Sequence, residues 1–169
     1  MKYHFVKQIK SFSYAFKGLF SVLNTEGHMR FHLIMSIYVI AFAMKFYDFS
    51  ATQWAVLILT VASVLFSEII NTALECVCDT ITKEYNENIK YIKDICAGAV
   101  LISAFASIAV GIFLFFDVDV FKDMYTFFFR TDIWALVALV LSIILSMTFI
   151  LIKPECYLGF LKKKNSDKL

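Results

Sequence analysis

The chain has 169 residues, of which 60% are hydrophobic and 18% charged, and its formal net charge is +2. Soluble domains usually contain about 45–50% apolar residues, and this excess, with a single proline, excludes a disordered chain. The length allows one domain. Apolar runs of about 20 residues indicate an all-α integral membrane protein, because a bilayer offers backbone groups no hydrogen-bond partner. No pattern of basic and aromatic residues points to a nucleic-acid partner.

Residues 4–24 carry apolar side chains at spacings of three and four. The apolar positions are Phe5, Ile9, Phe12, Phe16, Leu19, Phe20 and Leu23. Lys7, Lys10 and Lys17 fall between them, so the stretch predicts an amphipathic helix at the cytoplasmic surface of the membrane. Packing of this helix on the bundle is an equally open interpretation, and the two are compatible.

Four apolar stretches predict membrane-spanning helices, at about 31–49, 54–76, 96–116 and 133–152. Basic residues divide unevenly between the connecting segments, with 13 on one side of the membrane and 3 on the other. Because basic residues accumulate on the cytoplasmic side, both termini and the loop at about 79–94 are expected to be cytoplasmic. The segment 117–132 is expected to be an extracytoplasmic loop, and 133–169 to hold the fourth span and a basic cytoplasmic tail.

Four polar residues recur near the end of the second span: Glu68, Asn71, Glu75 and Asp79. At about 100° per residue they share an arc of roughly 80° on one helix face. A helix emerging into water explains Asp79 and serves also for Glu75. Glu68 lies deeper, where a charged carboxylate costs up to about 3 kcal/mol and is a functional candidate by default.

The depths of these carboxylates suggest a chemistry. A carboxylate at Glu68 meets the polar end of a lipid and can accept a proton from a lipid hydroxyl. Glu75 lies about 10 Å nearer the cytoplasm, where it suits Mg²⁺, which binds few carboxylates together with phosphate oxygens and water. Glu26 is a second candidate ligand, and Lys93 is placed to meet phosphate oxygens. The layout fits phosphoryl transfer from a nucleotide to a lipid, although a solvated charged loop also accounts for the residues around Lys93.

Five stretches carry a family resemblance: YAFKGL at 14–19, EGHMRFH at 26–32, EIINTALECVCD at 68–79, EYN at 84–86 and KDICAGAVLI at 93–102. Together they resemble the small integral-membrane lipid kinases of bacteria, the diacylglycerol kinase and undecaprenol kinase family. The third stretch paired with the fifth at this separation is highly specific. The resemblance runs from about residue 3 to residue 116 and implies a lipid kinase domain over 1–116, in the bacterial cytoplasmic membrane.

The resemblance also implies roles for individual residues. Glu68 matches the catalytic base, and Glu26 and Glu75 match the ligands of the Mg²⁺ that accompanies ATP. ATP contacts are implied for Lys7, Tyr14, Glu26, Glu75, Glu84, Tyr85, Asn86, Lys93 and Asp94, and lipid contacts for Glu68 and Ala97. Asn71 and Asp79 match positions that orient the site. Family members are homotrimers of three-span subunits with shared active sites, so a homotrimer is expected here, with the fourth span as an addition.

Three positions depart from the family pattern. His28 stands where the family usually has Asn, Asn86 replaces a frequent His, and Lys7 stands where Arg can occur. These changes concern nucleotide contacts and not the class of activity. The AGAVL and RFHL forms look closer to the undecaprenol kinase branch, with diacylglycerol as the alternative substrate. A proton or cation transporter and a purely structural membrane protein are the other hypotheses, and the chain shows neither the inverted repeats nor the broken helices typical of such transporters.

Overall fold

The structure is a computed structural model that describes residues 2–131 and 133–151, with side chains described for residues 8–130 and 133–151. Its helices are α1 Lys2–Thr25, α2 Gly27–Phe46, α3 Ala51–Ile81, α4 Glu87–Phe115, α5 Val118–Thr126, the π-helical segment η1 Phe127–Thr131 and α6 Ile133–Leu151. No strand occurs in these ranges, and the prediction of an all-α protein is confirmed.

Four of the helices, α2, α3, α4 and α6, are long and apolar enough to cross a membrane, as predicted for a multi-pass membrane protein. The helix α3 has 31 residues, which is about 46 Å of helix against a hydrocarbon thickness of about 30 Å. It continues beyond the predicted span because no glycine or proline interrupts residues 51–81. The helix is therefore longer than an apolar layer requires, and Glu75 and Asp79 lie near its C-terminal end.

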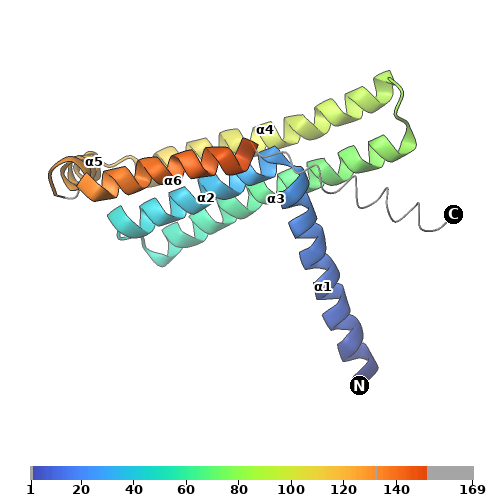
Figure 1. The fold of residues 1–169 in the computed structure, drawn as a ribbon, viewed down its shortest axis with the longest axis horizontal. Coiled ribbons are helices and arrows are strands. Elements are labelled where there is room, and N and C mark those ends of the chain that lie inside the picture. Colours follow the sequence, from blue (N-terminus) through green and yellow to red (C-terminus); the bar gives the residue numbers. More distant parts are fainter. Residues whose placement is uncertain (1, 132, 152–169) are drawn as a thin grey trace.

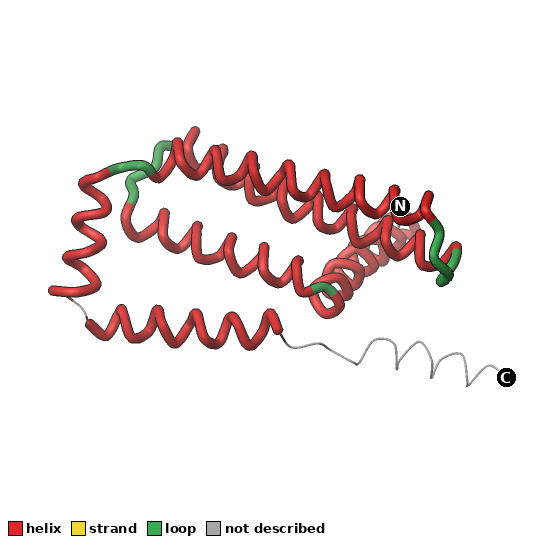
Figure 2. The backbone as a smooth tube through the Cα atoms, turned by 90° about the horizontal axis from the view of Figure 1, so that it is seen from above, coloured by secondary structure: helices red, strands yellow, loops and turns green. Residues whose placement is uncertain are grey.

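The helices α3 and α4 form an antiparallel hairpin, and α2 packs beside α3 (Figure 1). The helix α6 lies on the other side of α2, so that α2 stands between α3 and α6 (Figure 2). The helix α1 leaves the bundle at a steep angle, and apolar side chains such as Phe12 and Phe16 are exposed on it. The prediction of a helix over 4–24 is confirmed, while its position at the membrane surface stays a prediction.

One end of the bundle, around the turn between α2 and α3, is filled by aromatic side chains. We call it the aromatic end, and its rings, with centroids 5.1–5.7 Å apart, are Phe42, Tyr47, Phe49, Trp54 and Phe115. The Tyr47 hydroxyl donates to the carbonyl oxygen of Phe115 at 2.6 Å. Burial raises the pKa of Tyr47, and the charge of Asp117 adds to the rise, so the hydroxyl keeps its proton. Ser50 and Gln53 form a capping box at the start of α3.

The segment 117–132, expected to be a loop between spans, folds over most of its length into α5 and η1. Asp117 caps α5, because its Oδ1 accepts hydrogen bonds from two backbone N–H groups of the first turn. The rings of Phe127 and Phe128 in η1 lie 5.7 and 6.0 Å from Phe46 of α2, and this packing holds η1 against the bundle. The placement of this segment outside the cytoplasm stays a prediction, and residue 132 lies outside the described residues.

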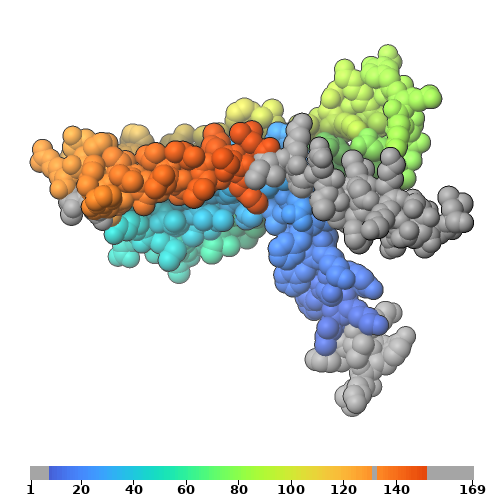
Figure 3. Space-filling view, in the orientation of Figure 1, coloured from blue at the N-terminus to red at the C-terminus, as the bar shows by residue number. Residues whose placement is uncertain are grey.

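The fourth span, α6, lies along α2 on the face seen in Figure 3. The Tyr38 hydroxyl of α2 hydrogen bonds to Ser142 Oγ at 3.0 Å and to Ser146 Oγ at 2.9 Å. Hydrogen bonds between membrane helices fix how the helices face one another, because lipid tails offer no alternative partner. The predicted basic tail follows α6 and lies outside the described residues.

Candidate active site

The polar residues of α3 lie along one continuous helix, as their spacing predicts, and they differ sharply in exposure. Glu68 is only 4% exposed, although it is a carboxylate in a membrane-spanning helix. Asn71 and Glu75 are half-buried, and Asp79 is exposed. The stripe therefore runs from a buried acid to an acid in solvent.

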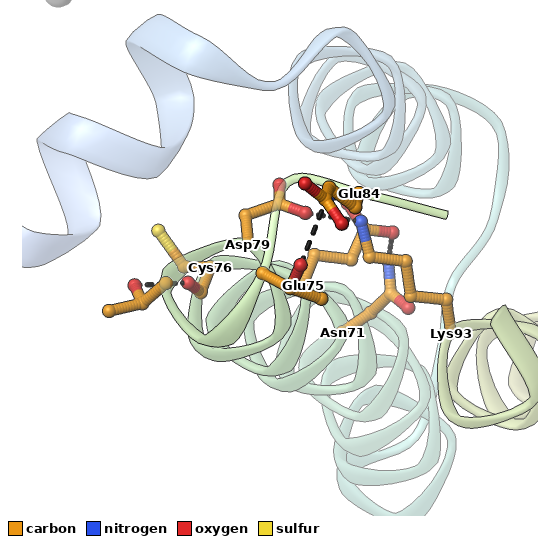
Figure 4. Close-up of polar contacts among 8 residues, drawn as sticks. Asn71, Glu75, Cys76, Asp79, Glu84 and Lys93 are labelled. Carbon is orange, nitrogen blue, oxygen red and sulfur yellow. Dashed lines mark hydrogen bonds and ion pairs between the residues drawn. The ribbon is translucent and has the colours of Figure 1, made fainter. Parts of the chain in front are cut away.

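The polar end of the bundle is the cluster of Glu68, Asn71, Glu75, Asp79 and Lys93, of which all but Glu68 are labelled in Figure 4. Asn71 Nδ2 donates to Glu75 Oε1 at 3.0 Å, which orients that carboxylate. Asn71 Oδ1 is buried and has no hydrogen-bond partner among the described residues. A buried oxygen of this kind can accept a hydrogen bond from a ligand.

An ion pair joins the two helices of the hairpin at the polar end. Lys93 Nζ of α4 lies 2.5 Å from Asp79 Oδ1 of α3 (Figure 4). The side chains keep 34% and 65% of their exposure, so water screens the pair and it contributes little to stability. Lys93 is therefore held at the polar end and remains able to exchange Asp79 for a phosphate group.

Glu26 comes within electrostatic range of Glu68 from another part of the chain. It is the one residue between α1 and α2, and its extended backbone (φ −105°, ψ 119°) makes the bend that we call the elbow, residues 23–27. Its carboxylate makes no capping hydrogen bond with α2. Glu26, Glu75 and His28 all lie close enough to act electrostatically on Glu68. The structure thus places the predicted base within electrostatic range of both predicted metal ligands.

These carboxylates fit the demands of Mg²⁺. Among the described residues there is no group of three or more His, Cys, Asp or Glu side chains that could hold a metal ion by themselves. Mg²⁺ does not need one, because it is bound through one or two carboxylates and keeps water and substrate phosphates as its other ligands. Glu26 in the elbow and Glu75 on α3, both within electrostatic range of Glu68, offer such an incomplete oxygen donor set.

The other predicted nucleotide residues are not gathered in the same way. Tyr14 is 68% exposed on α1, which points away from the bundle. Glu84 and Tyr85 are exposed in the turn between α3 and α4, and Asp94 and Ala97 are exposed on α4. The side chain of Lys7 lies outside the described residues.

Asn86 has a structural task that the sequence did not reveal. Its Oδ1 accepts hydrogen bonds from the backbone N–H groups of Asn88 at 2.9 Å and Ile89 at 3.3 Å, and so caps α4. The amide Nδ2 is not used in this cap, so a nucleotide contact through it stays a prediction.

Two residues near the site were not among the predicted site residues. His28 was noted only as a departure from the family pattern, and it lies within electrostatic range of Glu68. Arg30 is buried, with 4% exposure, beneath the elbow. One signal could have drawn attention to Arg30, since it is a cation at the beginning of an apolar run.

Comparison with known proteins shows which family the chain resembles. Residues 13–115 match the family described as prokaryotic diacylglycerol kinase. A diacylglycerol kinase of Synechocystis sp. is 40% identical over 102 residues, which are 60% of this chain and 58% of that protein. An undecaprenol kinase of Bacillus subtilis is 30% identical over 106 residues, covering 63% of this chain and 85% of the relative. A diacylglycerol kinase of Escherichia coli is 32% identical over 104 residues, covering 62% and 84%. The chain therefore belongs to the prokaryotic diacylglycerol kinase family, a family of membrane lipid kinases.

Proposed function

We propose that the chain transfers the γ-phosphoryl group of ATP to the hydroxyl of a membrane lipid alcohol, with Mg²⁺ bound beside the nucleotide. The observation that carries the proposal is the buried carboxylate of Glu68 inside a membrane-spanning helix, with Glu26 and Glu75 within electrostatic range. Membership of a lipid kinase family supports the class of reaction. Glu68 lies deep enough in the predicted span to meet a hydroxyl carried by a lipid. Glu75 lies two turns closer to the cytoplasm, where reactants arrive from water.

In the proposed reaction Glu68 accepts the proton of the lipid hydroxyl. The lipid oxygen forms a bond to the γ-phosphorus while the bond from that phosphorus to the bridging oxygen of ADP breaks. The products are a lipid phosphate and ADP, and the proton on Glu68 passes to water. Glu26 and Glu75 would hold Mg²⁺, which would offset negative charge on the phosphate oxygens.

Two neighbouring residues support this chemistry. Asn71 holds the Glu75 carboxylate through its Nδ2, while its unpartnered Oδ1 can accept a hydrogen bond from a bound ligand. Lys93 supplies a positive charge that can move from Asp79 to the phosphate groups. Asp79 then acts as the resting partner of Lys93 when no nucleotide is bound.

The lipid acceptor that we favour is undecaprenol, because the AGAVL and RFHL stretches of the sequence resemble the undecaprenol kinase branch of the family. Diacylglycerol is the second candidate, and the 40% identity to the Synechocystis diacylglycerol kinase supports it. An apolar groove between helices accommodates the hydrocarbon chain of either lipid. The acceptor is therefore identified by comparing phosphate transfer to the two lipids directly.

We further propose a homotrimer in the bacterial cytoplasmic membrane, with both termini in the cytoplasm. In the single chain Tyr14 lies on a helix that points away from the α3 stripe. The helix α4 exposes large apolar side chains along its length, such as Phe105 and Phe113. Neighbouring subunits would cover such faces and bring nucleotide residues of one subunit to the polar end of the next.

The experiment that tests the proposal is transfer of labelled phosphate from ATP with Mg²⁺, in mixed micelles, to undecaprenol and to diacylglycerol side by side. Glu68→Gln is the control, because it keeps the shape of the side chain and removes the base. Transfer that is lost in the control supports the kinase, and the preferred lipid identifies the acceptor. A well-folded protein without transfer to either lipid contradicts the proposal and reopens the transporter and structural hypotheses.

A further inference from the structure

The elbow that carries Glu26 is held by a buried arginine. Arg30 Nη1 donates to the carbonyl oxygens of Leu23 at 3.1 Å and Asn24 at 3.0 Å, which belong to the last turn of α1. Carbonyl groups at the end of a helix have no partner within the helix and carry its negative pole. The buried guanidinium on α2 therefore ties the end of α1 to the beginning of α2.

The same guanidinium also binds α6, from far along the chain. Arg30 Nη2 donates to the carbonyl oxygen of Ile150 at 3.1 Å, and the ring of Phe149 lies 5.9 Å from the guanidinium carbon. The last turn of α6 comes so close to the elbow that a methyl group on Gly27 would lie 3.7 Å from the Ile150 oxygen. One arginine thus joins the ends of α1 and α6, directly beside Glu26.

This junction links the part of the chain that matches the family to the part that does not. The family match ends at residue 115, whereas α6 begins at Ile133. The helix α6 is anchored on α2 by the hydrogen bonds of Tyr38 to Ser142 and Ser146, about two turns and one turn before Ile150. The anchor sets where the Ile150 carbonyl meets Arg30, because α6 is one unbroken helix between the two points.

We propose that Arg30 is a positioning residue and that α6 is a working part of the active site, since together they fix the elbow that presents Glu26 to the nucleotide-bound metal. The inference rests on the proposed function. The fourth span acts through a series of contacts and does not itself touch either substrate. Tyr38 holds α6, the Ile150 carbonyl of α6 holds Arg30, and Arg30 holds the elbow. An additional membrane helix outside the matched domain thereby tunes the affinity for the nucleotide.

The test uses the full chain in lipid nanodiscs, with variants at both ends of this connection. Tyr38→Phe removes the hydrogen bonds to α6 and leaves the ring, while Tyr125→Phe makes the same change on an exposed tyrosine of α5. Arg30→Lys keeps the charge but loses the planar fork that reaches several carbonyls. Arg30→Met removes the charge as well.

Two readouts are followed: the kinetic constants for MgATP, and hydrogen exchange of the backbone amides of residues 22–30. We expect Tyr38→Phe to raise the KM for MgATP about threefold, the change expected from losing two interhelical hydrogen bonds in a membrane. Both Arg30 variants should raise it about tenfold or more, because hydrogen bonds to a buried charge are lost. The kcat should change little, and elbow amides should exchange faster in step with KM.

The double variant of Tyr38→Phe with Arg30→Lys should behave like Arg30→Lys alone, because both changes act on one connection. Additive effects, or unchanged elbow exchange in Tyr38→Phe, would overturn the inference. If Arg30→Met fails to fold, Arg30→Lys and Tyr38→Phe still decide the outcome. Hydrogen exchange requires no activity, so it separates the two proposals. If the protein has no kinase activity but the elbow amides exchange faster in Tyr38→Phe, the proposed function is contradicted, while the connection between α6 and the elbow stands.

Discussion

At the aromatic end of the bundle the side chains satisfy one another, whereas the polar end holds a buried oxygen that has no hydrogen-bond partner among the described residues. Tyr47 donates its proton to Phe115, and Phe49 is 9% exposed among surrounding rings. At the polar end that oxygen is Asn71 Oδ1, and in the neighbouring elbow Glu26 makes no capping hydrogen bond. The helices α2, α3 and α4 are therefore fixed by packing at the aromatic end, while the polar end keeps groups that a ligand can engage. Substitutions at the two ends should therefore fail in different ways.

The largest effect should come from the buried acid of the polar end. We expect Glu68→Gln to lower kcat about 10³-fold or more, within the range attributed to a positioned general base, without loss of thermal stability. Stability should hold or rise, because the change removes a charge from a membrane-spanning helix. Phosphate transfer and a thermal unfolding scan of the same detergent-solubilised preparation measure both quantities. Unfolding of the variant at a much lower temperature would show that Glu68 is structural and would remove the contrast between the two ends.

The opposite result is expected at the aromatic end. Phe49→Ala should lower the free energy of unfolding by about 3 kcal/mol, because a large buried side chain leaves a cavity, while kcat of the folded fraction stays nearly constant. Phe113→Ala is the matched control, since Phe113 is 89% exposed on α4. Denaturant titration with activity normalised to the folded fraction measures the change. A loss of kcat in Phe49→Ala with stability unchanged would connect the aromatic end to catalysis.

A third prediction concerns the proposed metal ligands. Glu75→Gln keeps an oxygen that can accept the hydrogen bond from Asn71 but loses the negative charge. The Mg²⁺ concentration giving half the maximal rate should rise about tenfold, since Mg²⁺ sites depend on one or two carboxylates. Chelation of Mg²⁺ should abolish transfer in both proteins.

The matched control for Glu75→Gln is Glu87→Gln, an exposed glutamate of the same hairpin with no assigned role. Its Mg²⁺ dependence should equal that of the unmodified chain. If both variants shift the Mg²⁺ dependence equally, the effect is a change in overall surface charge, and the assignment of Glu75 as a metal ligand fails.

The sequence predicted those features of both ends that follow from a single helix or from the bilayer. The four spans are apolar because a bilayer requires it, and the stripe from Glu68 to Asp79 follows from the helical period. The helical fold of 117–131 was missed, because a short helix capped by Asp117 reads like a polar loop. The contact of Arg30 with Ile150 was missed as well, because the two residues are 120 positions apart and no local pattern connects them. Sequence periodicity therefore located the acids, while the support of Glu26 became visible only in three dimensions.

The smallest expected effect comes from Asn86, in the turn between α3 and α4. It tests whether this turn takes part in nucleotide binding together with the polar end. Asn86 caps α4 through Oδ1 and leaves Nδ2 for a nucleotide, so two substitutions separate the two tasks. Asn86→Ala should lower stability by about 1 kcal/mol through loss of the cap, whereas Asn86→Ser keeps a capping oxygen and should leave stability unchanged. Both should raise the KM for ATP about threefold if Nδ2 contacts the nucleotide, the value of one ordinary hydrogen bond. An unchanged KM in Asn86→Ser would make Asn86 a cap alone, and nucleotide recognition at this end would then rest on the residues of α3, the elbow and Lys93.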